Sequence, residues 1–251
     1  MKSLLKNIIV FIFGAERRTY TVLSGINKGL KIFASAKTEL SLIYGSFEPQ
    51  TQNIIKHFVS PGDVVFDIGA NVGYFTLSCS KLAGKNGKVY SFEAIPETAE
   101  ILEKNYHLNS LQNITLYKKA ASDKTEKTTF LIPDQGKNHT MASMVWHKED
   151  CSVKKVSVDS IVIDHDSELS KLSPSFIKID VEGAEAFVLK GMKSMLQNNS
   201  PIIFIECSEA GRKASWGLLT SLGYTCYKAS IPLQKVSDFK LYKHNDFLWT
   251  K

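Results

Sequence analysis

The feature that most constrains the fold is a regular alternation of short apolar runs with helical patterns beyond residue 60. The runs DVVFDIG, KVYSFEA, SFIKIDVEG and PIIFIEC are each followed by a stretch with helical periodicity. Strands that alternate with helices pair in parallel, because each helix returns the chain to the same edge of the sheet. The pattern therefore predicts an α/β fold with a doubly wound, mostly parallel sheet and helices on both faces. The runs YTCYKAS and DFLWTK have no helix between them, so the last strand is expected to be antiparallel.

Length and composition favour one main core. The chain has 251 residues, of which 43% are hydrophobic, and α/β domains often reach this size as a single unit. We expect residues 1–58 to form a helical and mixed lead-in packed on the core, and residues 59–251 to form the ligand-binding domain. Within that domain, residues 124–164 break the rhythm and predict a hairpin-like excursion. It could carry substrate contacts or be a surface loop without a role.

Charge and cysteine content limit the classes of partner. The 31 basic and 25 acidic residues give a net charge of +6, but the lysines are scattered and form no basic track. Nucleic acid is therefore not an expected partner, because binding it requires clustered cations. The four cysteines lie far apart, with no C-x-x-C pair and no accompanying histidine cluster. We therefore expect neither a metal site nor a disulfide framework.

The N-terminal segment MKSLLKNIIVFIFGAERR raises the question of a membrane. Its apolar run, residues 8–13, is far shorter than the about 20 residues that span a bilayer. A poor signal-peptidase site follows it, so we expect a cytoplasmic protein with no transmembrane span. Residues 1–20 could still contact a membrane surface or a partner subunit, and the sequence does not indicate the oligomeric state.

A glycine-containing loop follows the first of the alternating strands. Asp67, Gly69, Asn71 and Gly73 give the spacing D-x-G-x-N-x-G. The third glycine of a dinucleotide site is missing, and an acid at this place would repel a pyrophosphate. Glycines allow a ligand to approach the main chain closely, and the acid suits a ligand with positive charge, as in S-adenosylmethionine with its sulfonium and α-amino groups. The alternative is a tight strand–helix connection with no ligand.

The next two strands end in residues that suit a nucleoside. Glu93 lies 20 residues after Gly73, where a carboxylate could accept hydrogen bonds from both hydroxyls of a ribose. A surface glutamate would explain Glu93 alone, but its separation from the glycine loop favours a ligand contact. The third strand ends at Ala121, Ser122 and Asp123, whose small size would admit the edge of an adenine ring. Small polar residues also simply end strands.

Carboxylates crowd the end of a later strand, in FIKIDVEGAE. Asp180 and Glu182 are expected at the ligand cleft, where Asp180 would also contact the cofactor. Crowded carboxylates raise one another's pKa or hold a cation, which suits a general base or a metal site. The alternative is that Glu182 or Glu185 caps the following helix through its N-terminal dipole.

Several segments together resemble the FkbM family of S-adenosylmethionine-dependent methyltransferases: GSFEPQTQNIIKHFVSPGDVVFDIGANVGYFTL, GKVYSFEAIPE, LEKNYHLN, FIKIDVEGAEAFVLKGM and PIIFIE. The resemblance covers about residues 44–206. It implies the class I methyltransferase fold, with a seven-stranded Rossmann-like sheet. It also implies cofactor binding by Asp67, Gly69, Asn71, Gly73 and Glu93. The chain has Phe47-Glu48 where the family commonly has Tyr-Glu, so Glu48 matches and any tyrosine hydroxyl contact is lost. Ala94 replaces a usual proline.

The resemblance implies methyl transfer, often O-methylation of sugars or natural products, so we expect a small-molecule or carbohydrate acceptor. An alcohol acceptor must lose a proton, and a positioned base would help. The candidates are Asp180, Glu182 and His139, although His139 could be only a polar residue of the excursion.

Three other functions are weighed against this one. A non-catalytic nucleotide-binding module that keeps the fold is disfavoured by the acids Asp180 and Glu182. An NAD-dependent oxidoreductase is disfavoured by the missing third glycine. A nucleic-acid methyltransferase is disfavoured because IDVEGAE differs from the N/D-P-P-Y type of stretch and because acids repel phosphates.

Overall fold

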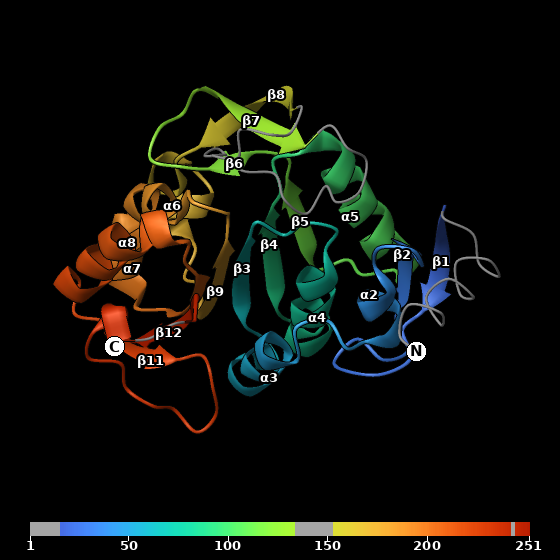
Figure 1. Cartoon of the computed structure of the whole chain (residues 1–251), viewed down its shortest axis with the longest axis horizontal. Coiled ribbons are helices and arrows are strands. Elements are labelled where there is room, and N and C mark those ends of the chain that lie inside the picture. Colours follow the sequence, from blue (N-terminus) through green and yellow to red (C-terminus); the bar gives the residue numbers. More distant parts are fainter. Residues whose placement is uncertain (1–15, 134–152, 242–243) are drawn as a thin grey trace.

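The computed structural model describes residues 16–133, 153–241 and 244–251. Its centre is a seven-stranded sheet (Figure 1) built from β3 (Val64–Ile68), β4 (Lys88–Phe92), β5 (Ile114–Tyr117), β9 (Phe176–Asp180), β10 (Ile202–Glu206), β11 (Thr225–Lys228) and β12 (Asp246–Thr250). The spatial order is β11-β12-β10-β9-β3-β4-β5. Neighbouring strands pair in parallel except at β12, which runs antiparallel to β10 and β11. The predicted fold class, including its antiparallel last strand, is confirmed.

Helices connect the strands and cover both faces of the sheet (Figure 1). They are α2 (Leu40–Tyr44), α3 (Pro49–Phe58), α4 (Tyr74–Ala83), α5 (Pro96–Leu108), α6 (Glu185–Gly191), α7 (Lys193–Asn199) and α8 (Glu209–Ser221), with the short 3-10 turns η2 (Ile163–His165), η3 (Leu169–Lys171) and η4 (Phe239–Leu241). Every helix in the described ranges is too short or too polar to cross a bilayer.

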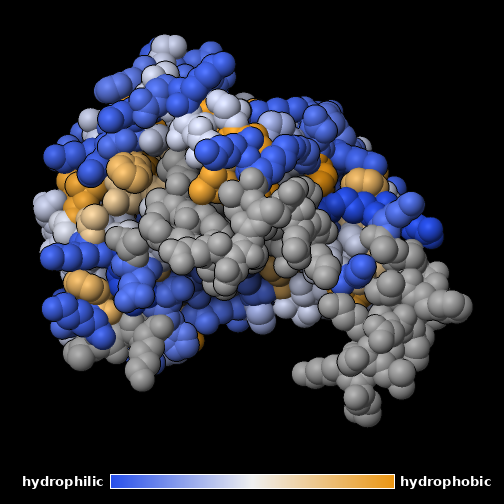
Figure 2. Space-filling view, turned by 45° about the horizontal axis from the view of Figure 1, so that its top comes forward, coloured by the Kyte–Doolittle hydropathy of each residue, from blue (hydrophilic) through white to orange (hydrophobic). Residues whose placement is uncertain are grey.

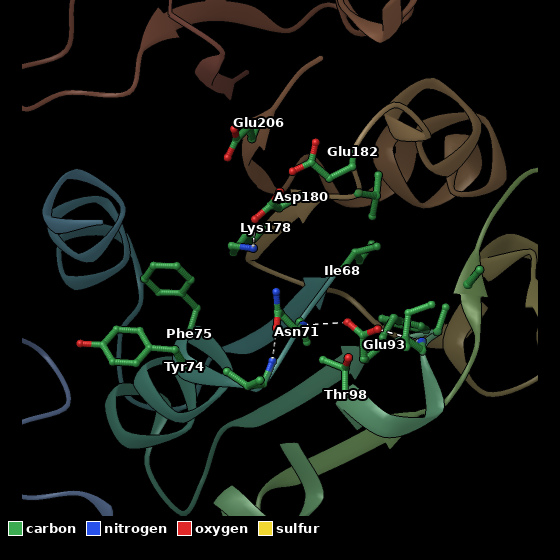
Figure 3. A pocket seen from close by; sticks show the side chains of 18 of the residues that line it. Ile68, Asn71, Tyr74, Phe75, Glu93, Thr98, Lys178, Asp180, Glu182 and Glu206 are labelled. Carbon is green, nitrogen blue, oxygen red and sulfur yellow. Dashed lines mark hydrogen bonds and ion pairs between the residues drawn. The ribbon is translucent and has the colours of Figure 1, made fainter. Parts of the chain in front are cut away.

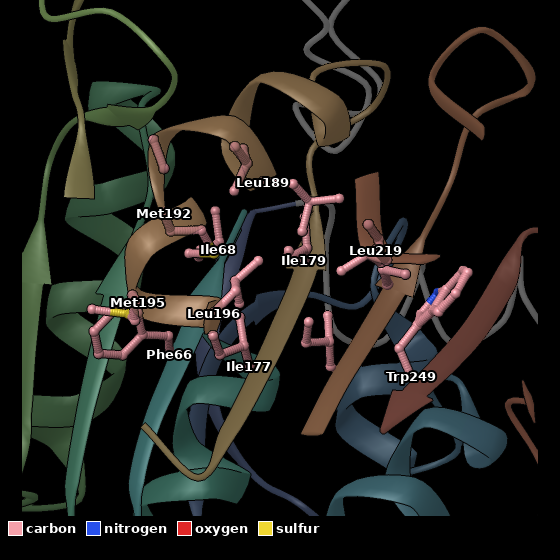
Figure 4. Close-up of a cluster of buried hydrophobic side chains, with 14 of the residues drawn as sticks. Phe66, Ile68, Ile177, Ile179, Leu189, Met192, Met195, Leu196, Leu219 and Trp249 are labelled. Atoms are coloured by element: carbon pink, nitrogen blue, oxygen red, sulfur yellow. The ribbon is translucent and has the colours of Figure 1, made fainter. Parts of the chain in front are cut away.

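Two apolar layers follow from the alternation of side chains along each strand. Phe66 and Ile68 of β3 belong to the cluster under α6, α7 and α8, which includes Leu196 (Figure 4). Val65, the residue before Phe66, belongs to the cluster on the opposite face, which includes Ile54 of α3. Buried on both faces, β3 must be apolar along most of its length. The exception in its sequence, an acid, therefore needs a specific partner.

The lead-in predicted for residues 1–58 contains strands as well as helices. Within residues 16–58, β1 (Arg17–Thr21) and β2 (Lys31–Ser35) pair antiparallel in a separate two-stranded sheet. Ile32 and Ile54 share the apolar cluster of Val65, so this region packs on the core. The expected membrane or partner contact by residues 1–20 falls mostly on residues 1–15, which lie outside the described residues.

The excursion of residues 124–164 contains β7 (Lys127–Pro133) and β8 (Val153–Ile161), which pair antiparallel. A two-residue strand, β6 (Ala120–Ala121), pairs with β8 in parallel and completes a three-stranded sheet. This sheet lies beyond the carboxyl ends of the central parallel strands (Figure 1). The single third strand expected over residues 114–122 is thus divided: β5 stays in the central sheet, and β6 leaves it.

A second expected element is also divided. The sequence predicts one helix over residues 184–196, but α6 and α7 are separated at Met192, whose backbone is not helical. Gly191, the last residue of α6, lies against the backbone of Ser122. A Cβ at Gly191 would be 1.9 Å from the Ser122 carbonyl oxygen. The close approach of the two segments explains the glycine.

The surface agrees with a mildly charged chain. Figure 2 shows a largely hydrophilic described surface on the side it displays, with hydrophobic side chains in small separate groups. Scattered apolar groups of this kind are normal on a globular protein.

Candidate active site

A cavity of about 470 Å³ opens at the carboxyl ends of β3, β4, β9 and β10 (Figure 3). Gly69 and Asn71 contribute to its wall from the loop after β3, Glu93 from the end of β4, Asp180 from β9 and Glu206 from β10. The three-stranded sheet contributes β6 and Phe130 of β7. This is the edge at which open α/β sheets bind ligands.

Glu93 is held at one end of this cavity by the main chain. Its Oε2 accepts a hydrogen bond from the Asn71 N–H and its Oε1 accepts one from the Ile95 N–H, both at 2.8 Å. Burial raises the pKa of Glu93 to about 7, although both N–H groups act to lower it. A carboxylate has about four acceptor sites, so Glu93 is fixed in position and still able to accept two further hydrogen bonds.

Thr98 lies beside Glu93 in the same wall (Figure 3). The residue is 2% exposed, and its Oγ1 has no hydrogen-bond partner within the described residues. Buried hydroxyls are rarely left without a partner. An unpartnered hydroxyl next to a fixed carboxylate indicates that this end of the cavity receives a polar ligand group.

The glycine loop is shaped by contacts inside the protein. Gly69 has a φ of +78°, and a Cβ there would lie 1.8 Å from the carbonyl oxygen of Asp180. Gly73 has a φ of +87°, and a Cβ there would lie 2.7 Å from Cγ of Leu102. Both glycines are therefore required by close packing of protein atoms. Gly73 is the N-cap residue before α4 and does not line the cavity, so its expected contact with a ligand stays a prediction.

Asp67 lies beneath the cavity wall. Its side chain is fully buried; Oδ2 accepts a hydrogen bond from Thr76 Oγ1 at 2.6 Å, and Oδ1 is 3.7 Å from Lys178 Nζ. Lys178 Nζ is also 3.2 Å from Oδ2 of Asp180, which lines the cavity. Asp67 does not line the cavity, so its expected contact with a ligand stays a prediction. Asp67 acts on the cavity through Lys178.

Lys178 is the charged centre of this end of the cavity (Figure 3). Burial lowers the pKa of its ammonium, but the carboxylates of Asp180, Asp67 and Glu48 outweigh burial, and the pKa is raised above its ordinary value. Lys178 therefore remains protonated. A buried lysine is stable only when paired in this way.

Four carboxylates gather around Lys178 from three segments of the chain. Glu48 and Glu182 approach from loops, and Asp180 and Glu206 from neighbouring strands whose register pairs them directly. Burial raises the pKa of Glu206 to about 8, and the charges of Asp180, Asp246, Glu48 and Glu182 add to the effect. The pKa values of Glu48 and Glu182 are raised as well, chiefly by burial. Within the described residues, no group of three or more such side chains is arranged to hold a metal ion.

Backbone strain concentrates at the same place. In the described part of the chain, five residues other than glycine have positive φ, and three of them line the cavity: Glu48 at 39°, Asn71 at 51° and Glu182 at 45°. Positive φ is costly for glutamate, and such strain clusters at functional sites. The strained backbone directs these three residues into the cavity wall.

An aromatic group forms the wall opposite Glu93. The ring of Phe47 is 5.5 Å from that of Tyr74 and 5.6 Å from that of Phe75, and the Phe75 ring is 5.5 Å from Lys178 Nζ. The hydroxyl of Tyr74 points away from Lys178 (Figure 3). The aromatic faces suit a cationic group, and the three rings also belong to the apolar cluster that includes Val65 and Ile54.

Four expected residues remain, and their positions differ. Ala121 lines the cavity. Ser122 does not, because its main chain pairs with Ile161 and packs against Gly191. His139 lies outside the described residues, so its role stays a prediction. Glu185, the alternative helix-capping acid, is fully buried and its Oε1 accepts a hydrogen bond from the Gly183 N–H at 2.7 Å, which is a structural role.

Three residues of the cavity were missed in the sequence. Lys178 could have been found, because a lysine between two isoleucines of a buried strand must have a counter-ion. Glu206 ends its strand as Glu93 does, and the same reasoning applied to PIIFIE would have placed it at the cleft. Thr98 gives no sequence signal, since threonine in a first helical turn is ordinary.

Fold and site together define a class I methyltransferase-like protein: a seven-stranded sheet with one antiparallel strand and a carboxylate-lined cavity at the switch point. A family model described as "Methyltransferase FkbM domain" matches residues 67–226. That is more than half of the chain, which belongs to the FkbM family of S-adenosylmethionine-dependent methyltransferases. The resemblance found in the sequence motifs is confirmed.

Individual relatives match shorter parts of the chain than the family model does. "Hexuronic acid methyltransferase AglP" of Haloferax volcanii is 31% identical over 141 residues, which is 56% of this chain and 54% of that protein. "Protein-L-isoaspartate O-methyltransferase" of Methanococcoides burtonii is 34% identical over 58 residues, 23% of this chain and 29% of that protein. The chain thus spans about half the length of AglP, and less of the second relative.

Among solved structures, that of the methyltransferase FkbM from Methylobacillus flagellatus KT is similar with a TM-score of 0.50. The match covers 100% of this chain and 60% of that chain, with 15% sequence identity. At this identity the similarity shows the fold alone.

Proposed function

We propose that the cavity binds S-adenosylmethionine and that the protein O-methylates a hydroxyl of a carbohydrate or another small molecule. The observation that carries this proposal is that a single cavity has two chemically different ends. Glu93, fixed by two backbone N–H groups, offers acceptors at one end, and acids around Lys178 lie at the other. A ligand that is a nucleoside at one end and a charged amino acid at the other fits both.

The residues present suit each part of this cofactor. Glu93 would accept the ribose hydroxyls, the unpartnered Thr98 hydroxyl lies next to it, and Ala121 leaves room for the adenine edge. Lys178 would bind the cofactor carboxylate, and Asp180 its ammonium group, because each carries the opposite charge. When bound, S-adenosylmethionine supplies an electrophilic methyl group. The protein aligns the acceptor with it and excludes water.

An acceptor hydroxyl must lose its proton as it is methylated. A carboxylate accepts this proton best when its pKa lies near the working pH. Glu206, with a pKa raised to about 8, meets this condition, and Glu182 is raised in the same direction. Asp180 is held in an ion pair with Lys178 and is assigned to the cofactor ammonium group instead. His139 remains a further candidate from the sequence.

The acceptor class rests on two supports. The family resemblance points to hydroxyls of sugars and natural products, and the name of AglP describes a methyltransferase of a sugar acid. Phe130 of β7 lines the same cavity and would contact such an acceptor.

Isothermal titration tests the cofactor part of the proposal. We expect micromolar binding of S-adenosylmethionine and S-adenosylhomocysteine and none of NAD, and a loss of at least about tenfold in affinity in Glu93→Ala. Glu100→Ala removes an exposed acid of α5, the helix that follows Glu93. It is the matched control and should bind the cofactor as tightly as the wild type does. No binding to a folded sample would refute the proposal. Binding without methyl transfer to any acceptor would favour the non-catalytic module.

A further inference from the structure

Thr98 is a buried residue of the cavity wall whose hydroxyl has no partner in the protein. It lies in the first turn of α5, is 2% exposed and lines the cavity. Its Oγ1 makes no hydrogen bond among the residues that the structure describes. A buried hydroxyl without a partner lowers stability, because it has given up its hydrogen bonds to water. A partner that comes from outside the chain would remove this cost.

The usual roles of a threonine in a first helical turn do not explain this hydroxyl. Such a side chain commonly bonds a carbonyl oxygen three or four residues earlier, or caps the start of the helix. Helix α5 begins at Pro96 without a side-chain hydrogen bond at its cap, and Thr98 Oγ1 bonds no carbonyl oxygen in the described chain. Valine would fill the same space without burying a polar atom. The described part of the fold therefore does not require the hydroxyl.

The surroundings of the Thr98 hydroxyl identify the kind of partner. Its oxygen lies on the side of the residue that faces Glu93 (Figure 3). Each oxygen of the Glu93 carboxylate already accepts one backbone N–H, from Asn71 and from Ile95. An ionised carboxylate has about four acceptor sites and no donor, so about two sites remain. A ligand group that fills these sites must donate hydrogen bonds.

The hydroxyls of a ribose meet the needs of both side chains, because a hydroxyl donates one hydrogen bond and has lone pairs that accept others. A ribose hydroxyl that donates to Glu93 still has its lone pairs available. The O–H of Thr98 can donate to one of them. The ligand oxygen then lies between a donor and an acceptor of the protein, and such connected hydrogen bonds strengthen one another in a buried site.

Resting on the proposed function, we infer that Thr98 is a specificity-determining residue for the sugar of the cofactor. Its hydroxyl donates a hydrogen bond to one of the two ribose oxygens that Glu93 also binds. A ligand without that oxygen leaves the Thr98 hydroxyl buried and unpaired, and sites built in this way reject analogues that lack the group. Thr98 thus selects a cofactor with an intact ribose.

A cycle of ligands and variants tests the inference. S-adenosylhomocysteine and its 2′-deoxy and 3′-deoxy analogues are titrated into the wild type and Thr98→Val. The titrations are made at about pH 8, because burial raises the pKa of Glu93 to about 7 and its carboxylate must be ionised. We expect Thr98→Val to bind S-adenosylhomocysteine at least about fivefold more weakly than the wild type does. For one of the two deoxy analogues the loss should be less than about twofold, because the oxygen that Thr98 binds is already absent.

The stability of the ligand-free protein separates this role from a structural one. Thr98→Val removes an unpartnered buried hydroxyl, so its Tm without ligand should equal or exceed that of the wild type. Thr98→Ser keeps the hydroxyl and should bind S-adenosylhomocysteine within about threefold of the wild type. Thr220→Val changes an exposed threonine of α8 outside the cavity lining and should leave the affinity unchanged.

Any of four results would overturn the inference. Thr98→Val could bind S-adenosylhomocysteine as tightly as the wild type, or lose the same factor for all three ligands. Its ligand-free Tm could fall, which would show that the hydroxyl supports the fold. Thr98→Ser could lose as much affinity as Thr98→Val. Failure of S-adenosylhomocysteine to bind the wild type would instead be a failure of the proposed function.

Discussion

Replacing Lys178 by methionine tests the electrostatic account of the site. The substitution keeps an unbranched apolar chain in a residue that is 2% exposed, but it leaves the fully buried Asp67 without its cation. At 3.7 Å and an effective dielectric constant of about 20, the lost attraction is about 4 kcal/mol. The second pair, with the partly exposed Asp180, contributes less because solvent screens it. We expect a loss of about 3–5 kcal/mol in the free energy of unfolding at pH 7.

Urea denaturation followed by circular dichroism measures this loss. Burial already raises the pKa of Asp67, and removal of the cation raises it further. Lys178→Met should therefore recover stability as the pH falls, because a protonated Asp67 no longer carries a buried charge. Asp67→Asn/Lys178→Met should be more stable than Lys178→Met at pH 7. Lys118→Met, which breaks an exposed pair with Glu103, should change stability by less than about 1 kcal/mol. A loss in Lys178→Met as small as in this control would refute the reasoning.

Three further changes test other parts of the structure. Gly69→Ala should destabilise by about 2–4 kcal/mol, because its Cβ would overlap the Asp180 carbonyl, whereas Gly29→Ala, with a similar φ and open space, should lose only about 1 kcal/mol; equal losses in urea melts would contradict this. Burial raises the pKa of Glu93 to about 7, so the wild type should lose stability as the pH rises through about 7 and Glu93→Gln should show a flatter profile between pH 5 and 8; parallel profiles in thermal melts would count against it. Glu185→Ala should destabilise by about 1–3 kcal/mol, because the partly buried N–H of Gly183 and hydroxyl of Ser208 lose their acceptor; a change below about 0.5 kcal/mol would show that water replaces it.

The sheet could be predicted from the sequence because its periodicity is local. Each buried strand is a short apolar run, and each connection has a helical pattern, so parallel order and an antiparallel end follow from chain direction. The divided third strand could not be predicted in this way. Ala120 and Ala121 follow β5 after only two lysines, and pairing with the distant β8 takes them out of the central sheet.

Within the site, position at a strand end could be predicted, but the direction of a side chain could not. Asp67 and Glu93 are both acids at the ends of strands, yet Glu93 lines the cavity and Asp67 lies beneath it. The difference depends on the pleat of each strand and on the position of Lys178. This lysine lies in β9, far from Asp67 in the sequence. The roles of Gly69 and Gly73 were likewise hidden, because the atoms that require them, in Asp180 and Leu102, are distant in the chain.

A crystal structure of the protein with S-adenosylhomocysteine would test the central claim most directly, namely that one cavity separates a nucleoside end from a charged end. The account predicts ribose hydroxyls on the Glu93 carboxylate and the amino-acid group of the ligand at Lys178 and Asp180. A ligand bound in the opposite direction, or at another place on the protein, would contradict it.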